Sequence, residues 1–180
     1  MYMSFNVVIN SPNTIDDLTQ GSVTTNELRY NFDWNFMDDC EYDLTFSFRT
    51  PWQNLGVTVN PVLTQIRIPD LGAAMSVYEV VKNTTGVSTT ASKSNVIGNV
   101  TTTEKFYGVT KNSNTGVLTH HSKVMYSAGA ADNGPVRLKS RPQSSTFTVK
   151  LCQPSGETPI SANAPLLYSL VLHFKKIDRY

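Results

Sequence analysis

Four carboxylates crowd into one short stretch of the chain and form its densest group of side chains that could do chemistry. They are Asp38, Asp39, Glu41 and Asp43. Carboxylate oxygens gathered on one loop can hold Ca²⁺ or serve as an acid and base pair. Three of the four alternate with apolar residues of a predicted strand, which puts them on its solvent face, and the glycine spacing of an EF-hand is missing. The pattern favours an exposed, solubilising turn, with a cation site as the alternative.

Three histidines could take part in metal binding or general-base catalysis: His120, His121 and His173. Neighbouring residues of a strand point to opposite faces, so His120 and His121 are badly placed to bind one metal ion together. His173 points outward from the predicted C-terminal strand. The sequence contains no HExxH or GxSxG motif and no Cys/His arrangement of known spacing. We therefore expect no catalytic, cofactor or metal site, and no enzymatic activity.

Basic side chains gather at Arg137–Arg141 and again at Lys175, Lys176 and Arg179. They could contact phosphate or an acidic partner, but no aromatic residues are interleaved with them for base stacking. The whole chain has 15 Lys and Arg against 14 Asp and Glu, a net charge of +1. This balance excludes the electrostatic footprint of a dedicated nucleic-acid binder, so we expect no specific nucleic-acid partner.

The two tryptophans and two cysteines complete the chemically distinctive residues. Trp34 has the parity of a core residue, whereas Trp52 follows Pro51 and is the one plausible exposed platform for a sugar. Cys40 and Cys152 lie too far apart for a metal-binding pair and are too few for a disulfide framework. Because the N-terminal residues carry no signal-peptide pattern, we expect a reducing cytoplasm and two free thiols. No run approaches the ~20 apolar residues that span a bilayer.

Composition indicates which elements must position these residues. The 180 residues include 21 Thr, 18 Val and 7 Ile, which are β-branched, against only 8 Ala and 5 Glu. Such a chain favours sheet over helix. Its length suits a single domain over residues 1–180, with at most a short helical turn near Leu71–Met75.

Alternation of apolar and polar residues marks the strands. Leu28–Phe36 and Tyr42–Phe48 both place large apolar side chains at even positions. We expect a common core between two sheets to contain Tyr30, Phe32, Trp34, Leu44, Phe46 and Phe48. A hairpin is the favoured connection between these two strands, and a crossover is the alternative. The C-terminal strand Leu166–Phe174 is partly apolar on its second face, which predicts a central place in a sheet or cover by another subunit.

Further strands follow at short spacing and make a sandwich or barrel the expected architecture. Asn83–Asn99 and Ser127–Pro135 are expected to be long polar loops, and Asn112–Gly116 a tight hairpin turn. The remaining predicted strands are Ser4–Ile9, Val57–Val59, Val62–Ile68, Ser76–Val81, Glu104–Val109, Val117–Tyr126, Val136–Leu138 and Ser145–Cys152.

Three segments of the C-terminal third share a pattern of strand spacing and strand endings: Gly134–Gln143, Phe147–Leu151 and Tyr168–Phe174. This pattern resembles the single-jelly-roll penton and minor capsid proteins of large icosahedral double-stranded DNA viruses and their satellites. The aromatic strands between Leu28 and Phe48 add to the resemblance. It implies an all-β single jelly-roll β-sandwich of two antiparallel four-stranded sheets, which serves as a shell subunit without catalysis. It assigns no role to individual side chains.

The expected function is therefore that of a structural capsid protein, a penton or minor capsid subunit, made in the host cytoplasm and carried in the virion. Its expected partners are copies of itself, with a pentamer favoured, and other capsid proteins, without a membrane span. Leu167 and Val171, on the second face of the terminal strand, would be buried laterally by such neighbours. The alternative is a carbohydrate- or receptor-binding β-sandwich module, and an enzyme on the same scaffold is disfavoured by the missing metal ligands.

Overall fold

The computed structural model describes residues 3–16, 26–51, 53–55, 65–71, 79–83, 86–90, 96–152, 159 and 167–178. At 53–55, 79–83, 86–90, 101–108 and 119–124 the description is of the backbone alone. Within these ranges the helices η1 (Ser11–Asn13) and η3 (Pro69–Leu71) are single 3-10 turns. None of the described helices is long and apolar enough to cross a membrane.

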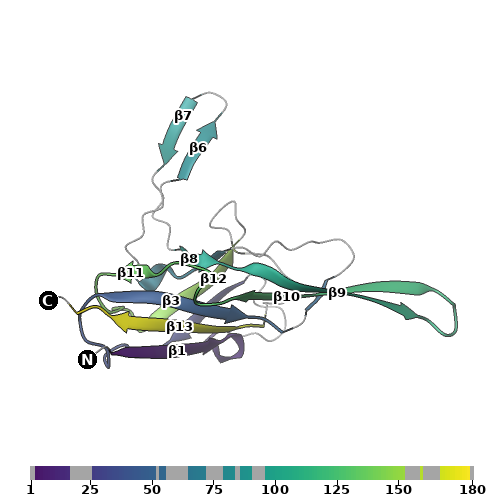
Figure 1. Ribbon diagram of the computed structural model, residues 1–180, viewed down its shortest axis with the longest axis horizontal. Coiled ribbons are helices and arrows are strands. Elements are labelled where there is room, and N and C mark those ends of the chain that lie inside the picture. The colour runs from purple at the N-terminus through teal and green to yellow at the C-terminus, as the bar shows by residue number, and fades with distance from the viewer. Residues whose placement is uncertain are drawn as a thin grey trace.

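The strands form two antiparallel sheets and a separate two-stranded ribbon (Figure 1). The first sheet contains β1 (Ser4–Asn10), β3 (Tyr42–Arg49), β4 (Gln53–Leu55), β9 (Thr101–Lys111), β10 (Leu118–Ala128), β11 (Val136–Leu138) and β13 (Ser169–Lys176). The second sheet contains β2 (Glu27–Asn31), β5 (Gln65–Arg67), β8 (Val96–Asn99) and β12 (Thr146–Cys152). The ribbon pairs β6 (Glu79–Asn83) with β7 (Gly86–Thr90).

Strand order confirms the all-β prediction of two antiparallel sheets. The first sheet runs β1-β13-β3-β10-β4, with β11 also paired to β3 and β9 to β10, and the second runs β2-β12-β5-β8. The expectation of two four-stranded sheets is wrong for the first, which has seven strands. Pro51 separates β3 from β4, and proline interrupts a ladder because it has no N–H to donate.

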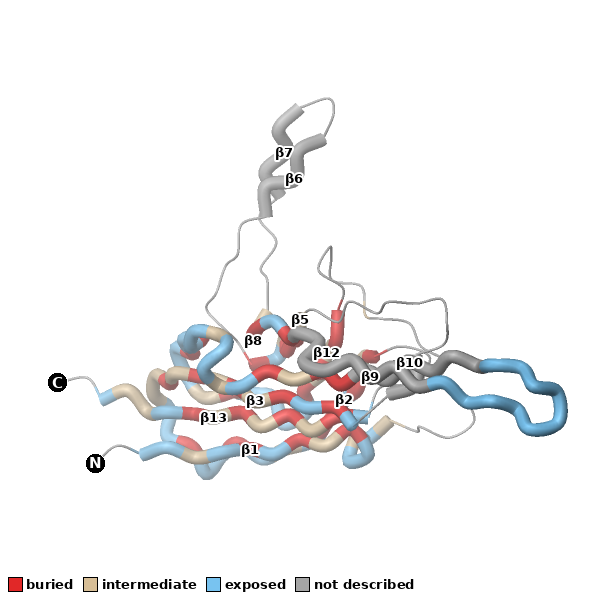
Figure 2. The backbone as a smooth tube through the Cα atoms, turned by 45° about the vertical axis from the view of Figure 1, so that its right-hand side comes forward, coloured by how far each residue is buried: buried red, intermediate tan, exposed pale blue. Residues whose placement is uncertain are grey.

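The core is a single cluster of buried residues from both sheets, and Figure 2 shows buried positions recurring along β1, β13 and β3. Along β3 every even residue is buried, and β13 repeats this alternation. The opposing residues come from all four strands of the second sheet. The large buried residues include Leu28, Tyr30, Tyr42, Leu44, Phe46, Phe48, Phe147, Val149, Leu151, Leu170, Leu172 and Phe174. The predicted parity is therefore confirmed for β3 and β13, and β13 lies centrally, between β1 and β3.

The predicted strand Leu28–Phe36 ends earlier than expected. β2 stops at Asn31, and Asp33 Oδ1 then accepts a hydrogen bond of 2.9 Å from the N–H of Asn35, which turns the chain. Trp34 remains buried and Phe32 is half-buried, but Phe36 is 58% exposed. The predicted strand is thus wrong beyond Asn31, and the alternation fails at Phe36 because it holds only while the backbone stays extended.

The predicted hairpin between these two strands is also wrong. β2 pairs with β12 in the second sheet, whereas β3 pairs with β13 in the first. The connection is the crossover alternative. The N–H of Met37 donates to the carbonyl of Trp34 over 2.9 Å, which closes a turn between the layers instead of returning the chain along its own sheet.

Two of the predicted loops have different outcomes. Asn83–Asn99 is not one loop, because it contains β7, β8 and the end of β6. Its threonines and valines are β-branched and suit strands, although its polarity suggested a loop. The tight turn at Asn112–Gly116 is confirmed: Gly116 has a φ of 71°, and its N–H donates to the carbonyl of Asn112 over 2.8 Å.

Other predicted elements fall partly outside the described residues. Val57–Val59 lies there entirely, and the predicted helical turn lies there beyond Leu71. The strands expected at Ser4–Ile9, Val136–Leu138 and Ser145–Cys152 match β1, β11 and β12. The strand expected at Val62–Ile68 is described from β5 onward.

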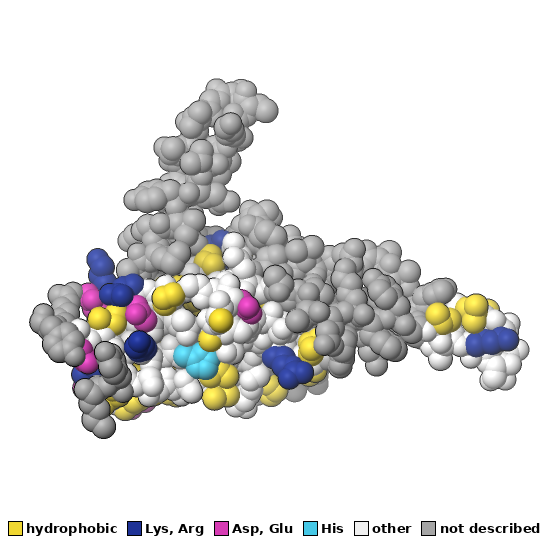
Figure 3. Space-filling view, viewed as in Figure 1, with side chains coloured by type: hydrophobic (Ala, Val, Ile, Leu, Met, Phe, Trp, Pro, Cys, Tyr) yellow, Lys and Arg dark blue, Asp and Glu magenta, His cyan; other side chains and the backbone are white. Residues whose placement is uncertain are grey.

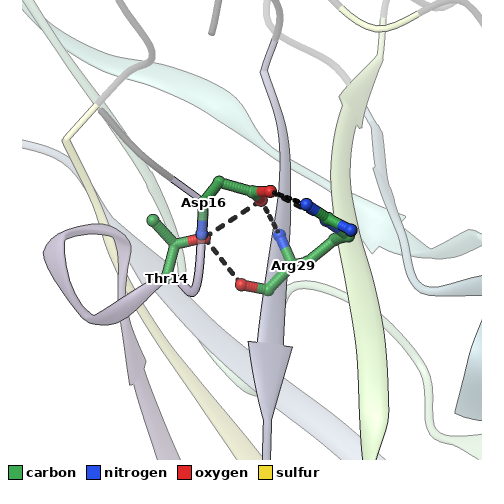
Figure 4. Close-up of polar contacts among 3 residues, drawn as sticks. All are labelled: Thr14, Asp16 and Arg29. Atoms are coloured by element: carbon green, nitrogen blue, oxygen red, sulfur yellow. Dashed lines mark hydrogen bonds and ion pairs between the residues drawn. The ribbon is translucent and has the colours of Figure 1, made fainter. Parts of the chain in front are cut away.

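A polar clip joins the segment after β1 to the edge of the second sheet (Figure 4). Arg29 in β2 donates to Asp16 through its side chain over 2.7 Å and through its backbone N–H over 2.6 Å. Thr14 donates to the carbonyl of Arg29 over 2.6 Å. Partial burial would raise the pKa of Asp16, but these bonds from Arg29 and Thr14 outweigh it and lower that pKa.

Candidate functional site

The acidic cluster and the basic segment of the sequence meet at one end of the first sheet. We call this group the charged patch: Asp38, Glu41, Asp43, Arg137 and Lys176. Residues of β3 and β11 lie opposite each other, so Arg137 pairs with Asp43, and their Nε and Oδ1 atoms are 2.8 Å apart. Glu41 lies 3.6 Å from the same guanidinium, and Lys176 Nζ lies 2.7 Å from Asp38 Oδ2.

The ion pairs determine the electrostatics of the charged patch. The hydrogen bond and charge of Lys176 lower the pKa of Asp38, and Asp38 in turn raises the pKa of Lys176. Among the residues that the structure describes, no three His, Cys, Asp or Glu side chains lie where they could hold a metal ion. Since three of the four predicted carboxylates are engaged by cations, the patch matches the solvated turn better than the cation site.

The remaining basic residues have separate positions. Arg141 donates to the backbone carbonyls of Asn35 and Met37 over 3.4 and 3.3 Å and so braces the turn after β2. Lys139 is exposed and lines a hollow of about 540 Å³ with Asp39, Glu41 and Lys176. Carboxylates of the same hollow offset its cations, so it presents no purely basic surface to a phosphate.

His173 links three strands through hydrogen bonds on the outer face of the first sheet. Its Nε2 lies 2.9 Å from Ser47 Oγ in β3, and its Nδ1 lies 2.8 Å from Asn6 Oδ1 in β1. Its outward direction is confirmed. With Nδ1 donating to Asn6, Nε2 accepts from the serine hydroxyl, an order of groups also found in nucleophilic sites. Asn6 and His173 occupy directly paired positions of β1 and β13, where side chains meet in any sheet. The hydrogen-bonded series Ser47–His173–Asn6 therefore matches ordinary cross-strand polar pairing as well as it matches a nucleophilic site.

The other candidates from the sequence are structural where they are described. Trp34 is buried and donates from Nε1 to the carbonyl of Ser144 over 3.0 Å. Cys40 is half-buried and Cys152 buried, and neither is part of a disulfide. Trp52 and Arg179 lie outside the described residues. The side chains of His120 and His121 lie outside the description as well.

A larger and more apolar depression, which the sequence did not indicate, lies at the other end of the sandwich. We call it the end groove: Asn10–Asn13, Arg49–Pro51, Met125 and Leu167–Ser169, around a volume of about 700 Å³. Its walls include the exposed residues Pro12, Pro51 and Leu167. Leu167 was expected to need a neighbour, and it is 52% exposed.

Buried hydroxyls fix the floor of the end groove. Ser11 Oγ accepts from the N–H of Tyr168 over 2.9 Å, and the N–H of Ser11 donates to the carbonyl of Tyr168 over 3.0 Å. On the opposite wall, Thr50 Oγ1 accepts from the N–H of Tyr126 over 3.0 Å. These paired bonds tie the ends of four strands together, so the groove is a preformed surface.

The β9–β10 hairpin projects beyond the sandwich as a two-stranded ribbon (Figure 1). We call its outer part, Val109–Leu118, the arm. Every residue of the arm is exposed. Val109, Val117 and Leu118 are between 57% and 59% exposed, and hydrophobic side chains stand at the surface of the projection beside a basic one (Figure 3).

No family model, curated protein or solved structure matches this chain. Among the uncovered apolar features of the described surface are the end groove and the arm.

Proposed function

We propose that this chain is a single jelly roll that serves as a structural subunit of an icosahedral viral capsid, in a penton or minor shell position. The observation that carries the proposal is the nested pairing of its strands. In a jelly roll the eight strands pair first with eighth, second with seventh, third with sixth and fourth with fifth.

Eight strands of this chain, taken in order, have that pairing: β1, β2, β3, β5, β8, β10, β12 and β13. β1 pairs with β13, β2 with β12, β3 with β10 and β5 with β8. The additional contacts of β13 with β3 and of β12 with β5 join the pairs into two sheets. In this interpretation β4 and β11 continue strands that are interrupted, and the β6–β7 ribbon and β9, with the arm, are insertions.

Surface chemistry supports assembly. The end groove and the arm leave apolar side chains uncovered on one chain, and apolar surface of this kind is typical of contacts between proteins. A net charge of +1 lowers the repulsion between identical copies packed side by side. The resemblance to penton proteins favours a five-fold ring.

The test is a cryo-electron reconstruction of particles that contain the chain, together with the mass of the purified protein. The expected result is density for this chain in repeated positions around the five-fold axes. A chain found solely as a soluble monomer that binds a sugar on a glycan array, or that turns over a small substrate, would contradict the proposal and favour the binding module or an enzyme.

A further inference from the structure

We propose that β1, the strand at one edge of the first sheet, pairs with β1 of a second copy of this chain across a two-fold axis. The two strands would run antiparallel and join the first sheets of both copies into one. The inference goes beyond the proposed function, because a two-fold contact links two copies and does not by itself close a five-fold ring.

The outer edge of β1 carries unused backbone groups. β1 pairs with β13 on one side and is the outermost strand of its sheet in both views (Figure 1, Figure 2). Lys176 donates its N–H to the carbonyl of Met3, and Ser11 donates its N–H to the carbonyl of Tyr168, each over 3.0 Å. Odd positions of β1 therefore face β13, and the N–H and C=O groups of even positions face the open edge. Within the described part of the chain, these outward backbone groups have no hydrogen-bond partner at Ser4, Asn6, Val8 and Asn10.

The two edges of the second sheet are covered, in contrast to β1. In β2 the N–H of Arg29 donates to Asp16, and its carbonyl accepts from Thr14. In β8 the N–H of Asn99 donates to Oδ1 of Asn133, and its carbonyl accepts from Nδ2 of Asn133, each over 2.9 Å.

No described residue covers β1 in this way. The strand also contains no proline, no charged residue and no bulge, the features with which edge strands commonly avoid pairing. β1 is therefore an edge that can accept another strand.

Exposed apolar side chains accompany this open edge. Met3 and Val8 are 53% and 59% exposed. Phe36 is 58% exposed and packs edge-on against the half-buried Phe5 of β1, with ring centroids 5.1 Å apart. Apolar surface of this kind is typical of contacts between proteins, so a protein strand suits the edge better than solvent does.

The sequence of β1 is complementary to itself. Outward backbone groups belong to even residues, so an added strand must place its own outward residues opposite them. A two-fold axis through Val7 pairs the whole of Ser4–Asn10, with Ser4 opposite the partner's Asn10 and Asn6 opposite the partner's Val8. The four pairs would exchange two hydrogen bonds each, eight in all. On the core side Phe5 would lie opposite the partner's Ile9, which continues the apolar layer from one copy to the next.

The distribution of charge permits a second copy at this position. β1 itself is uncharged, and the charged residues of β13, Lys175 and Lys176, lie opposite Ser4 and Met3 at one end of β1. In the two-fold register Ser4 and the partner's Ser4 are six residues apart, roughly 20 Å at about 3.4 Å per residue. That separation exceeds the Debye length of about 8 Å at physiological salt, so the lysines of the two copies repel each other little.

Sedimentation equilibrium of the full chain, with two lysine variants, tests the contact. Val8→Lys puts a charge on the open edge, and Val109→Lys is the matched control, since both are strand valines with 59% and 57% exposure. We expect the unmodified chain to form dimers. Val8→Lys should raise the dissociation constant about tenfold or more, because a lysine on an edge strand opposes pairing, and Val109→Lys should leave it unchanged.

Two outcomes of sedimentation would overturn the inference. One is an unmodified chain that remains monomeric up to about 1 mM, since so weak an association would not hold two copies together. The other is an equal effect of the two lysine variants, which would put the contact outside β1.

Disulfide trapping tests the register and does not depend on the lysine variants. Asn6→Cys and Val8→Cys are purified separately, mixed and mildly oxidised, and the mixed dimer is identified by its mass. Hydrogen-bonded pairs have Cα atoms about 5.5 Å apart, a span that a disulfide can bridge. The control mixes Asn6→Cys with Val109→Cys, and the unmodified chain measures the background from Cys40 and Cys152. We expect about tenfold more mixed dimer from the first mixture, and equal yields would overturn the inference.

The outcome is separable from that of the proposed function. Particles that contain the chain at five-fold positions, together with equal cross-link yields, would contradict this inference alone. A specific cross-link from a chain that is absent from such positions would contradict the shell assignment alone.

Discussion

The sandwich and the arm both contain strands that carry apolar side chains, yet these side chains differ completely in burial. In β3, Leu44, Phe46 and Phe48 are at most 2% exposed because the second sheet covers this face, with Phe46 lying against Gly98 of β8. In the arm, Val109 and Leu118 also share one face but have no second layer among the described elements. The difference teaches that strand-forming sequence does not by itself create a core, since burial depends on a facing sheet.

The largest effect should follow truncation in the sandwich. Phe46→Ala removes a buried aromatic between the sheets and should lower the free energy of unfolding by about 3–5 kcal/mol, measured by denaturant titration. Thr45→Ala, on the outer face of the same strand, should change it little. Equal losses of unfolding free energy from the two substitutions would contradict the assignment of Phe46 to a buried face of β3 and Thr45 to an outer face.

A methyl group added at Gly98 should have the next largest effect. A Cβ there would lie 2.7 Å from Cζ of Phe46 and 2.8 Å from Cγ of Asn133, closer than atoms pack. Gly98→Ala should therefore cost about 1–3 kcal/mol of unfolding free energy, the usual penalty of overpacking. Combining it with Phe46→Leu should cost less than the sum of the two changes, and strict additivity would show that the sheets are not in contact here.

The clip of Thr14, Asp16 and Arg29 tests how firmly the edges of the sandwich are joined. Asp16→Asn should cost about 1 kcal/mol, because Arg29 is largely exposed and solvent screens the pair. The folded pKa of Asp16 lies below its ordinary value of 3.8, so the unfolded chain binds the proton first. The ionised Asp16 carboxylate therefore contributes its full share to the free energy of unfolding above pH 3.8, and this share is lost as the pH falls below that value. As the pH falls below 3.8, the free energy of unfolding should decline less for Asp16→Asn than for the unmodified chain. An equal decline in the two proteins would contradict the role given to the clip.

The smallest effect on stability should come from the arm. Val117→Asp should change the unfolding free energy of dilute protein by less than about 0.5 kcal/mol, because an exposed side chain loses little on substitution. Thermal melting of Val117→Asp and Phe46→Ala at low protein concentration compares the stability effect of a substitution in the arm with that of one in the sandwich. A large loss in the dilute variant would show that the sandwich itself covers Val117.

Local pattern predicted the strands better than it predicted their partners. Alternation located β1, β3, β12 and β13, since it depends on neighbours in sequence. The mistaken hairpin between β2 and β3 is different, because pairing joins residues more than a hundred positions apart, such as Tyr30 and Phe147. The polarity of Asn83–Asn99 was misleading because threonine suits loops and strands alike.

The candidate surfaces were partly visible in the sequence. Leu167 carried a signal, since it is apolar where the alternation of the last strand required a polar residue. The end groove carried none, because Pro12, Met125 and Leu167 come from three distant segments. The arm carried a weak signal, because the apolar residues Val109, Val117 and Leu118 flank the predicted turn Asn112–Gly116.

The pairing of β1 with β13 has a consequence for synthesis. β13 is the partner of both β1 and β3, so during translation neither strand can form this pairing until residues 169–176 have been synthesised. Contacts this distant in sequence slow folding, and unpaired strand edges promote aggregation meanwhile. A nascent chain stopped before Ser169 would keep both edges open, so the ribosome-bound protein would depend on chaperones until its final strand emerged.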